Sequence, residues 1–351
     1  MPLGPLEPLE DAAPLADGRC ASKAGFRCNL AFYLRLVVVV LVGFWIAKTL
    51  RDAGAEFSAA KFSVNDLDLV FVVLSALSYL VGLLFFGLFW HLALRAMGQH
   101  PTLLESVRSY TLSHLGKYVP SKALVVVIRC DRVVSSRVDR SVAVVGVFIE
   151  TLGMMAVGGI LASLLLIAGY GSTHESGWLT LLAVGLAVGS GVGASPPMFR
   201  FVLRYLIKRR EIFTLGEAID GLSWSFFIKG WLLAAVGWLF FSGSMVFLLH
   251  ALPANESGPI LAPGNYPQVV VAVSLSIVAG FVSLLPGGAG VRELVISATL
   301  APLIGPVLAM ISAISLRILW LLCELGAAAG FLIHFRKSKR WAKSKPTNLG
   351  V

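Results

Sequence analysis

QVVVAVSLSIVAGFVSLLPGGAGVRE, residues 268–293, carries no charged side chain before Arg292 and contains a proline and three glycines just ahead of it. Other uncharged runs cover 69–94, 151–173, 176–199, 230–255 and 294–316. A membrane span needs about 20 apolar residues, and these runs are too long for barrel strands. Only 14% of the 351 residues are charged, against about 25% in soluble proteins. We therefore predict an all-α polytopic integral membrane protein with about eight transmembrane or partial spans.

The distribution of basic residues predicts the orientation in the membrane. Most of the 29 lysines and arginines lie before the first span, in 95–140, in 196–229 and in the tail from Arg336, whereas 170–178 and 251–268 hold none. Because basic loops stay on the cytoplasmic side, we expect both termini to be cytoplasmic, in the plasma or inner membrane. Topology alone explains the net charge of +10, so we expect no nucleic-acid partner.

The chain is expected to have three parts. Residues 1–29, proline-rich and acidic before turning basic, predict a disordered cytoplasmic segment. Residues 30–335 form the predicted transmembrane domain, and 336–351 a basic cytoplasmic tail. Unbroken spans are predicted from about Leu34 and at about 67–92, 142–169, 178–197, 226–250, 268–285 and 307–334. The four cysteines and six histidines show no metal-ligand spacing, so we expect no metal or other cofactor.

Two hydrophobic segments are interrupted and predict broken or re-entrant helices. They are residues 107–130, VRSYTLSHLGKYVPSKALVVVIRC, and residues 286–306, which begin with PGGAGVRE. Interrupted segments in both halves of a membrane protein indicate a binding site near the bilayer midplane, built on repeats. Ser113, Pro120 and Arg129 align loosely with Ser283, Pro286 and Arg292. An inverted repeat and a chance similarity both remain open.

The second interrupted segment has the features of an anion site. Pro286 and the glycines release the chain from helical structure, so a new helix is expected to begin near Val291. Its first turn would present free N–H groups beside the guanidinium of Arg292, which suits a phosphate. The alternative is a cytoplasmic turn capped by Arg292 and Glu293 next to the lipid head groups.

Glu150, Arg317 and Glu324 are charged residues well inside predicted spans. A charge at the centre of a membrane helix costs about 2.5–3.5 kcal/mol on insertion scales, so each should face protein or water and have a partner. Arg317 is expected to pair with Glu150 or Glu293, and Glu324 with Arg292 or Arg129. Structural pairing, a role in a transport pathway and snorkelling to the interface are the open interpretations.

Asp66 and Asp68 form an acidic pair at the start of the second span. Membrane glycosyltransferases use such pairs on the outer face to hold a metal or to act as a base. Acidic residues are equally common as caps of a helix N-terminus. Enzyme activity on lipid-linked sugars is therefore an alternative function.

Two motifs resemble the lysylphosphatidylglycerol synthase transmembrane region, also called the flippase-like family. The first comprises Gly116, Lys117, Tyr118, Pro120, Lys122 and Arg129, and the second Pro286, Gly287, Gly288, Gly290, Arg292 and Glu293. Glu150 resembles an acidic position that follows the first motif. The resemblance covers roughly 30–335. It departs from the family pattern at Ser121, where the family usually has glycine.

This resemblance implies a lipid-translocating domain, like the membrane region of multiple peptide resistance factors, which moves aminoacylated phosphatidylglycerol between leaflets. In those factors a soluble aminoacyl-transferase domain follows. This chain ends soon after its last predicted span, so we expect no synthetase domain and no enzyme activity. Archaeal relatives are linked to glycan assembly on polyprenyl lipids.

We therefore expect a flippase-like protein that binds an anionic phospholipid or a polyprenyl-phosphate-linked lipid and moves it between leaflets. The residues expected to bind the phosphate are Gly287, Gly288, Gly290, Arg292, Lys117, Lys122 and Arg129. Those expected to line the pathway or form structural ion pairs are Glu150, Glu293, Arg317 and Glu324. A non-catalytic scaffold for a separate soluble transferase is the main alternative, beside the glycosyltransferase.

Overall fold

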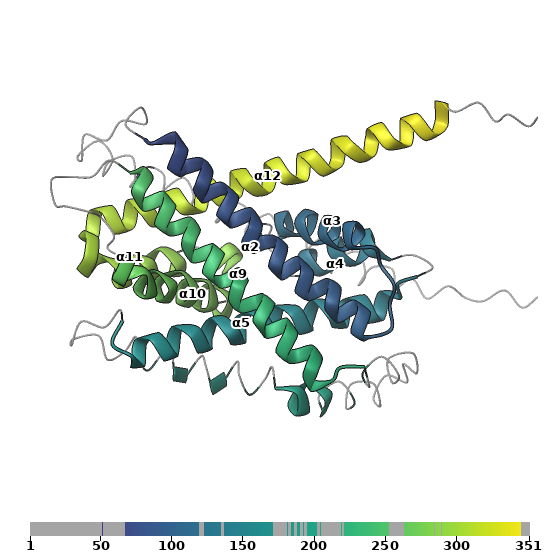
Figure 1. Cartoon of the computed structure of the whole chain (residues 1–351), viewed down its shortest axis with the longest axis horizontal. Helices are drawn as coiled ribbons and strands as arrows, with labels where there is room; N and C mark the ends of the chain where they lie inside the picture. The colour runs from purple at the N-terminus through teal and green to yellow at the C-terminus, as the bar shows by residue number, and fades with distance from the viewer. Residues whose placement is uncertain are drawn as a thin grey trace, which may run out of the picture. The chain divides into compact units, whose positions relative to one another are not determined.

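The computed structural model describes residues 67–118, 123–134, 137–170, 221–252, 263–283, 285–288 and 290–344, with Arg51 and scattered positions between 181 and 219. All secondary-structure elements within these ranges are helices, which confirms the all-α prediction (Figure 1). The predicted first span and most of the predicted span at 178–197 lie outside the described residues. So do the predicted disordered segment and the end of the tail.

Four described helices are long and apolar enough to cross a membrane: α2 (Leu69–Ala96), α5 (Arg140–Ile167), α9 (Trp224–Ala251) and α12 (Pro306–Ser344), the last through its part up to Ile333. They coincide with four of the predicted spans. The first three begin at side-chain caps, Asp68, Asp139 and Ser223, which accept hydrogen bonds from backbone N–H groups in the first turn. The chain is thus an integral membrane protein.

Both interrupted segments are broken helices, as predicted. The first consists of α3 (Leu103–His114), the 3₁₀ turn η2 (Leu115–Tyr118) and α4 (Ala123–Val133). Before the second segment, η3 (Pro263–Asn265) leads into α10 (Tyr266–Val282), which overlaps the predicted span at 268–285. The second segment itself consists of η4 (Pro286–Gly288) and α11 (Val291–Ile304). At about 1.5 Å per residue, α3, α4 and α11 are roughly 16–21 Å long, too short for a hydrocarbon core of about 30 Å.

The second break follows from its proline and glycines. Gly287, Gly288 and Gly290 have φ angles of 60°, 67° and 81°, a region that side chains disfavour. The helix after them begins at Val291, as the sequence predicts. η2 and η4 contact each other, so two breaks far apart in the sequence meet inside the protein.

The hydrophobic core includes a close contact between α2 and α9, which run side by side (Figure 1). Aromatic rings of one helix lie directly over glycines of the other: Phe86 over Gly237, Phe89 over Gly230, and Phe241 over Gly82. Small residues allow membrane helices to approach closely and to gain dispersion contacts. Phe241 and Tyr79 extend this packing toward α12, where both rings contact Trp320.

Gly230→Ala is expected to destabilise the protein. An added Cβ would overlap Cε2 of the buried Phe89, so the ring or the helix must shift. Overpacking of this kind costs about 1–3 kcal/mol. Thermal unfolding in detergent would measure the loss. Gly326→Ala on α12 is the matched control, because no described atom lies within 4 Å of its added methyl group. Equal melting temperatures for the two variants would contradict this account of the α2–α9 contact.

Candidate functional site

A cavity of about 350 Å³ lies where the two breaks meet. Its volume is within the range of sites for small ligands. One part of its lining is apolar and includes Val126, Phe148, Met155, Ile277 and Phe281. The other part is polar and consists of Tyr79, Tyr110, His114, Lys117, Arg129, Glu150, Thr151 and Arg292, with Gly287 and Gly288. Charged and apolar surfaces therefore share one cavity inside a membrane domain.

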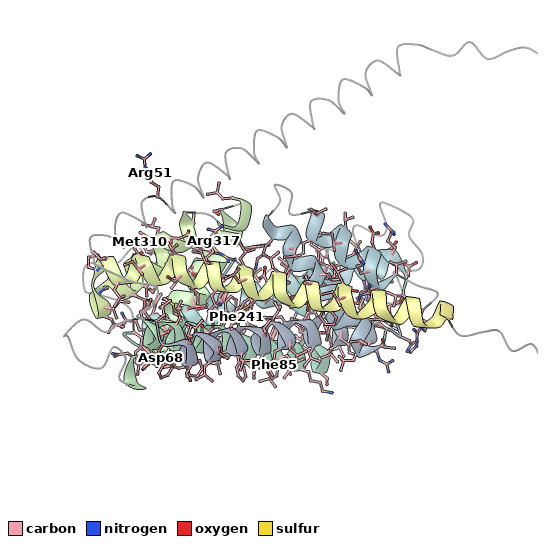
Figure 2. The ribbon with its side chains drawn as sticks, turned by 90° about the horizontal axis from the view of Figure 1, so that it is seen from above. Arg51, Asp68, Phe85, Phe241, Met310 and Arg317 are labelled. Carbon is pink, nitrogen blue, oxygen red and sulfur yellow. The ribbon has the colours of Figure 1, made fainter. Side chains whose placement is uncertain are left out.

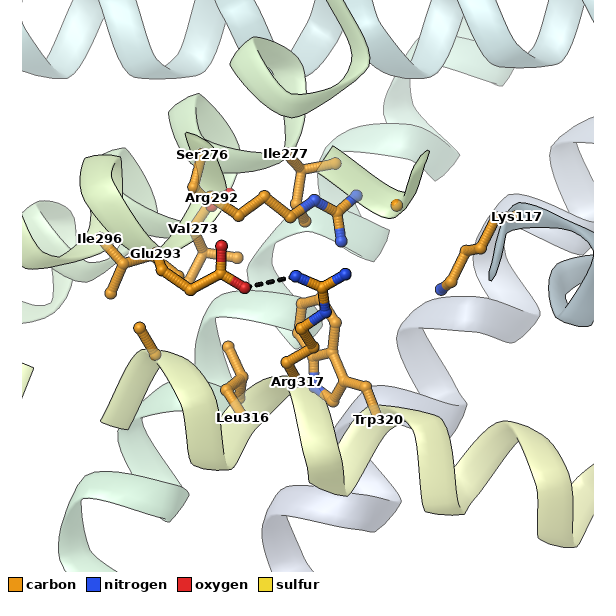
Figure 3. A pocket seen from close by; sticks show the side chains of 12 residues that line it. Lys117, Val273, Ser276, Ile277, Arg292, Glu293, Ile296, Leu316, Arg317 and Trp320 are labelled. Carbon is orange, nitrogen blue, oxygen red and sulfur yellow. Dashed lines mark hydrogen bonds and ion pairs between the residues drawn. The ribbon is translucent and has the colours of Figure 1, made fainter. Parts of the chain in front are cut away.

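A second, much smaller cavity of about 20 Å³ adjoins the charged part. It shares Lys117, Gly287 and Arg292 with the larger cavity and adds Glu293 and Arg317. Figure 3 shows the guanidinium groups of Arg292 and Arg317 facing each other, with the Lys117 side chain directed toward them from another element. A space of this size holds about one water molecule. Three cationic side chains from η2, α11 and α12 thus converge.

Glycines make room for the side chain of Arg292. A Cβ added to Gly280 of α10 would lie 2.9 Å from Arg292 Cγ, and one added to Gly288 would lie 3.1 Å from Arg292 Nε. A Cβ at Gly287 would lie 3.0 Å from Nη2 of Arg317. The glycines of the second motif therefore allow two arginines to lie against the backbone.

Glu293, in the first turn of α11, forms an ion pair with Arg317 of α12. Arg317 Nη1 donates to Glu293 Oε1, which is one of the two pairings expected for Arg317. Glu293 Oε2 accepts the backbone N–H of Gly290 at 2.8 Å, and the N–H of Gly288 donates to Leu285 O at 3.0 Å. These two amides, which we expected to bind phosphate, have partners within the protein. Glu293 caps the helix, while the Arg292 side chain lines both cavities.

Lys117 binds Glu324 of α12, a pairing that the sequence did not indicate. Its Nζ donates to Glu324 Oε1, and so does the Tyr79 hydroxyl. Nδ1 of His114 lies 3.6 Å from the same oxygen. Glu324 is 0% exposed, and its Oε2 has no hydrogen-bond partner among the described residues. Three cavity-lining side chains thus surround one buried carboxylate.

Arg129 forms a second buried ion pair rather than binding Glu324. Its Nη1 lies 2.7 Å from Glu150 Oε2, and its Nε donates to Ser113 Oγ at 3.0 Å. The Tyr110 hydroxyl donates to Glu150 Oε1 at 3.0 Å, and the Tyr110 ring lies 4.2 Å from the Arg129 guanidinium carbon. Arg129 is only 3% exposed, and its pair with Glu150 connects α4 to α5.

Most predicted site residues therefore lie around the two cavities. Lys122 lies outside the described residues, and Gly290 takes part through the cap of α11. The sequence missed Tyr79, Tyr110 and His114. A buried carboxylate needs hydrogen-bond donors, so the sequence indicated that Glu150 and Glu324 have such partners. This rule does not indicate which residues of the chain provide them.

Asp68, the described half of the acidic pair, acts as a helix cap. Its Oδ1 accepts the backbone N–H of Val70 at 2.9 Å, and the side chain is exposed at the start of α2. Figure 2 shows it well apart from Arg317. Asp66 lies outside the described residues. Within the part of the chain that the structure describes, no three His, Cys, Asp or Glu side chains are arranged to hold a metal ion.

Asp68→Asn is expected to leave the free energy of unfolding within about 0.5 kcal/mol of the wild-type value, because asparagine caps helices as well as aspartate does. Thermal unfolding in detergent would measure the change. Loss of a metal-dependent glycosyl transfer in this variant would instead support the glycosyltransferase alternative.

A family model described as "Lysylphosphatidylglycerol synthase TM region" matches residues 32–325, which include both breaks and all the side chains around the cavities. No curated protein matches the chain.

Proposed function

Because the chain belongs to the lysylphosphatidylglycerol synthase transmembrane-region family, we propose that it binds the phosphate of an anionic lipid head group and moves that lipid between leaflets. The observation that carries this proposal is the cavity where the two helix breaks meet, which joins converging cations to an apolar surface. Irregular backbone at membrane depth is tolerated where it lines such a cavity.

The charges around the two cavities suit a singly charged anion. Four cations and three anions leave one positive charge: Lys117, Arg129, Arg292 and Arg317 against Glu150, Glu293 and Glu324. A phosphodiester carries one negative charge and would balance it. Both an anionic phospholipid and a polyprenyl-phosphate-linked lipid present a phosphate of this kind, so the charges support the class rather than one lipid.

The side chains differ in how available they are to a phosphate. Arg129 already interacts with Glu150, Ser113 and Tyr110, so its charge would attract the phosphate without a direct hydrogen bond. Arg292 lines both cavities from the first turn of α11 and presents the planar donor group that binds phosphate best. Lys117 also lines both cavities, from η2; it pairs with Glu324, but its side chain is 23% exposed, against 3% for Arg129. We assign Arg292 and Lys117 as the primary phosphate ligands.

The apolar part of the cavity would receive the rest of the lipid near its phosphate. Valine, phenylalanine and methionine side chains from α4, α5 and α10 can cover the glycerol region and the beginning of the chains. In this proposal the protein binds and positions its ligand without making or breaking covalent bonds. Its effect is to lower the cost of moving a charged head group through hydrocarbon.

Reconstitution into liposomes tests this function. The vesicles would carry fluorescent phosphatidylglycerol, its aminoacylated form or a neutral lipid, with a quencher outside. We expect the protein to expose inner-leaflet anionic lipid to the quencher faster than protein-free vesicles do, and the neutral lipid more slowly than the anionic one. Equal rates with and without protein would refute lipid transfer. In that case the scaffold alternative predicts a soluble transferase that co-purifies.

A further inference from the structure

Glu324 lies just beneath the surface of the larger cavity and is joined to it by three polar side chains. Lys117 and Tyr79 donate to its Oε1, and His114 is 3.6 Å from that oxygen. All three side chains line the cavity, whereas Glu324 itself is fully buried. Lys117 therefore stands between a buried carboxylate and the space that a head group would occupy.

Lys117 has two competing anions once a lipid phosphate enters. In the structure its ammonium group neutralises Glu324. A phosphate that attracts the same ammonium group weakens this pair and leaves Glu324 as a buried anion with less countercharge. Burial strongly disfavours the charged form of an unpaired carboxylate, so such a group takes up a proton rather than stay charged.

We propose that Glu324 is a proton-binding site coupled to the head group, so that each anionic lipid bound at Lys117 is accompanied by one proton bound at Glu324. This inference rests on the proposed function. The proton comes from water in the cavity and adds to a carboxylate oxygen, while Lys117 keeps its own proton and moves its contact from carboxylate to phosphate. The proton replaces the countercharge that Lys117 no longer provides to Glu324.

The groups around Glu324 favour this carboxylate as the proton acceptor. Facing it or its partners are Tyr79 of α2, Tyr110 and His114 of α3, Lys117 of η2, Arg129 of α4, Glu150 of α5, Arg292 of α11, and Arg317 and Cys323 of α12. The described cavity lining from α9 and α10 has no titratable side chain. His114 is the alternative acceptor, but a protonated imidazole would face the positive charges of Lys117 and Arg129.

Coupling has a measurable consequence for transport. By linkage, if lipid binding promotes protonation, protonation promotes lipid binding to the same extent. A difference in pH across the membrane could then drive net movement of an anionic lipid without a nucleotide.

The test measures proton uptake on binding. Purified full-length protein in a neutral detergent would be titrated with short-chain phosphatidylglycerol in weak buffer, with a pH-indicator dye and calorimetry as readouts. We expect about one proton taken up per head group, and an affinity that rises by up to tenfold for each unit of falling pH. Glu324→Gln should bind the probe without proton uptake and with little pH dependence. His114→Gln should retain both the proton uptake and the pH dependence of binding.

Each outcome decides between the two proposals. Binding by the wild type without proton uptake would overturn the coupling and leave the proposed function standing. Uptake that persists in Glu324→Gln, or that is lost in His114→Gln alone, would overturn the assignment to Glu324. Failure of the wild-type protein to bind the probe would refute the binding of a phospholipid head group, and the coupling with it. The wild-type measurement decides the coupling even if a variant does not fold.

Discussion

Arg292→Ala is expected to slow transfer of anionic lipid by about 10–150-fold, because a hydrogen bond to a charged group contributes about 1.5–3 kcal/mol. The planar guanidinium can form two such bonds with one phosphate, and this range counts only one of them. Arg292 lines both cavities and lies over Gly280 and Gly288, so its removal leaves space without forcing the backbone to move. The liposome assay measures the rate, and size-exclusion chromatography checks that the variant folds.

Two matched variants separate the binding role from charge alone. Arg292→Lys keeps the positive charge but loses the planar donor group, so its transfer rate should lie between those of the wild type and of Arg292→Ala. Arg140→Ala removes an arginine whose side chain is 65% exposed and whose partner, Asp131, is 47% exposed. This variant should transfer lipid at the wild-type rate. A folded Arg292→Ala protein with unchanged transfer would remove this residue from the site.

Glu150→Ala is expected to be the most destabilising of the substitutions considered, by about 3–5 kcal/mol. It leaves Arg129 buried with its charge uncompensated and removes the acceptor of the Tyr110 hydroxyl. Thermal unfolding in detergent would show a large fall in melting temperature. The double substitution Glu150→Ala with Arg129→Met removes the stranded charge, and should recover much of the loss because apolar side chains can replace a buried ion pair.

The exposed pair of Asp131 with Arg140 provides the comparison for this effect. Asp131→Ala breaks an ion pair of similar length, 2.7 Å, at an exposed position. Such pairs contribute about 0–1 kcal/mol because water screens the charges. We therefore expect Asp131→Ala to lower the melting temperature much less than Glu150→Ala does. Equal decreases would show that burial does not make the Arg129–Glu150 pair more important for stability than the exposed pair.

Local patterns in the sequence predicted much of this molecule. The length of the uncharged runs identified membrane helices, since a span needs a set number of apolar residues. Proline and glycine placed both helix breaks and the start of α11 at Val291, because these residues change backbone preferences at their own positions. Arg292 follows directly in the first turn of that helix, so its position beside the break could also be predicted from the sequence.

The partners of the charges depended on tertiary structure. Arg317 pairs with Glu293, one of two expected partners, but Glu324 pairs with Lys117, which lies 207 residues earlier in the chain. Helix rotation and the depth of each side chain decide such pairs, and both arise from packing among several helices. Composition and spacing therefore determined that this is a membrane protein with two broken helices. Only the folded chain determined which cations face the cavity, because that depends on how helices distant in sequence pack together.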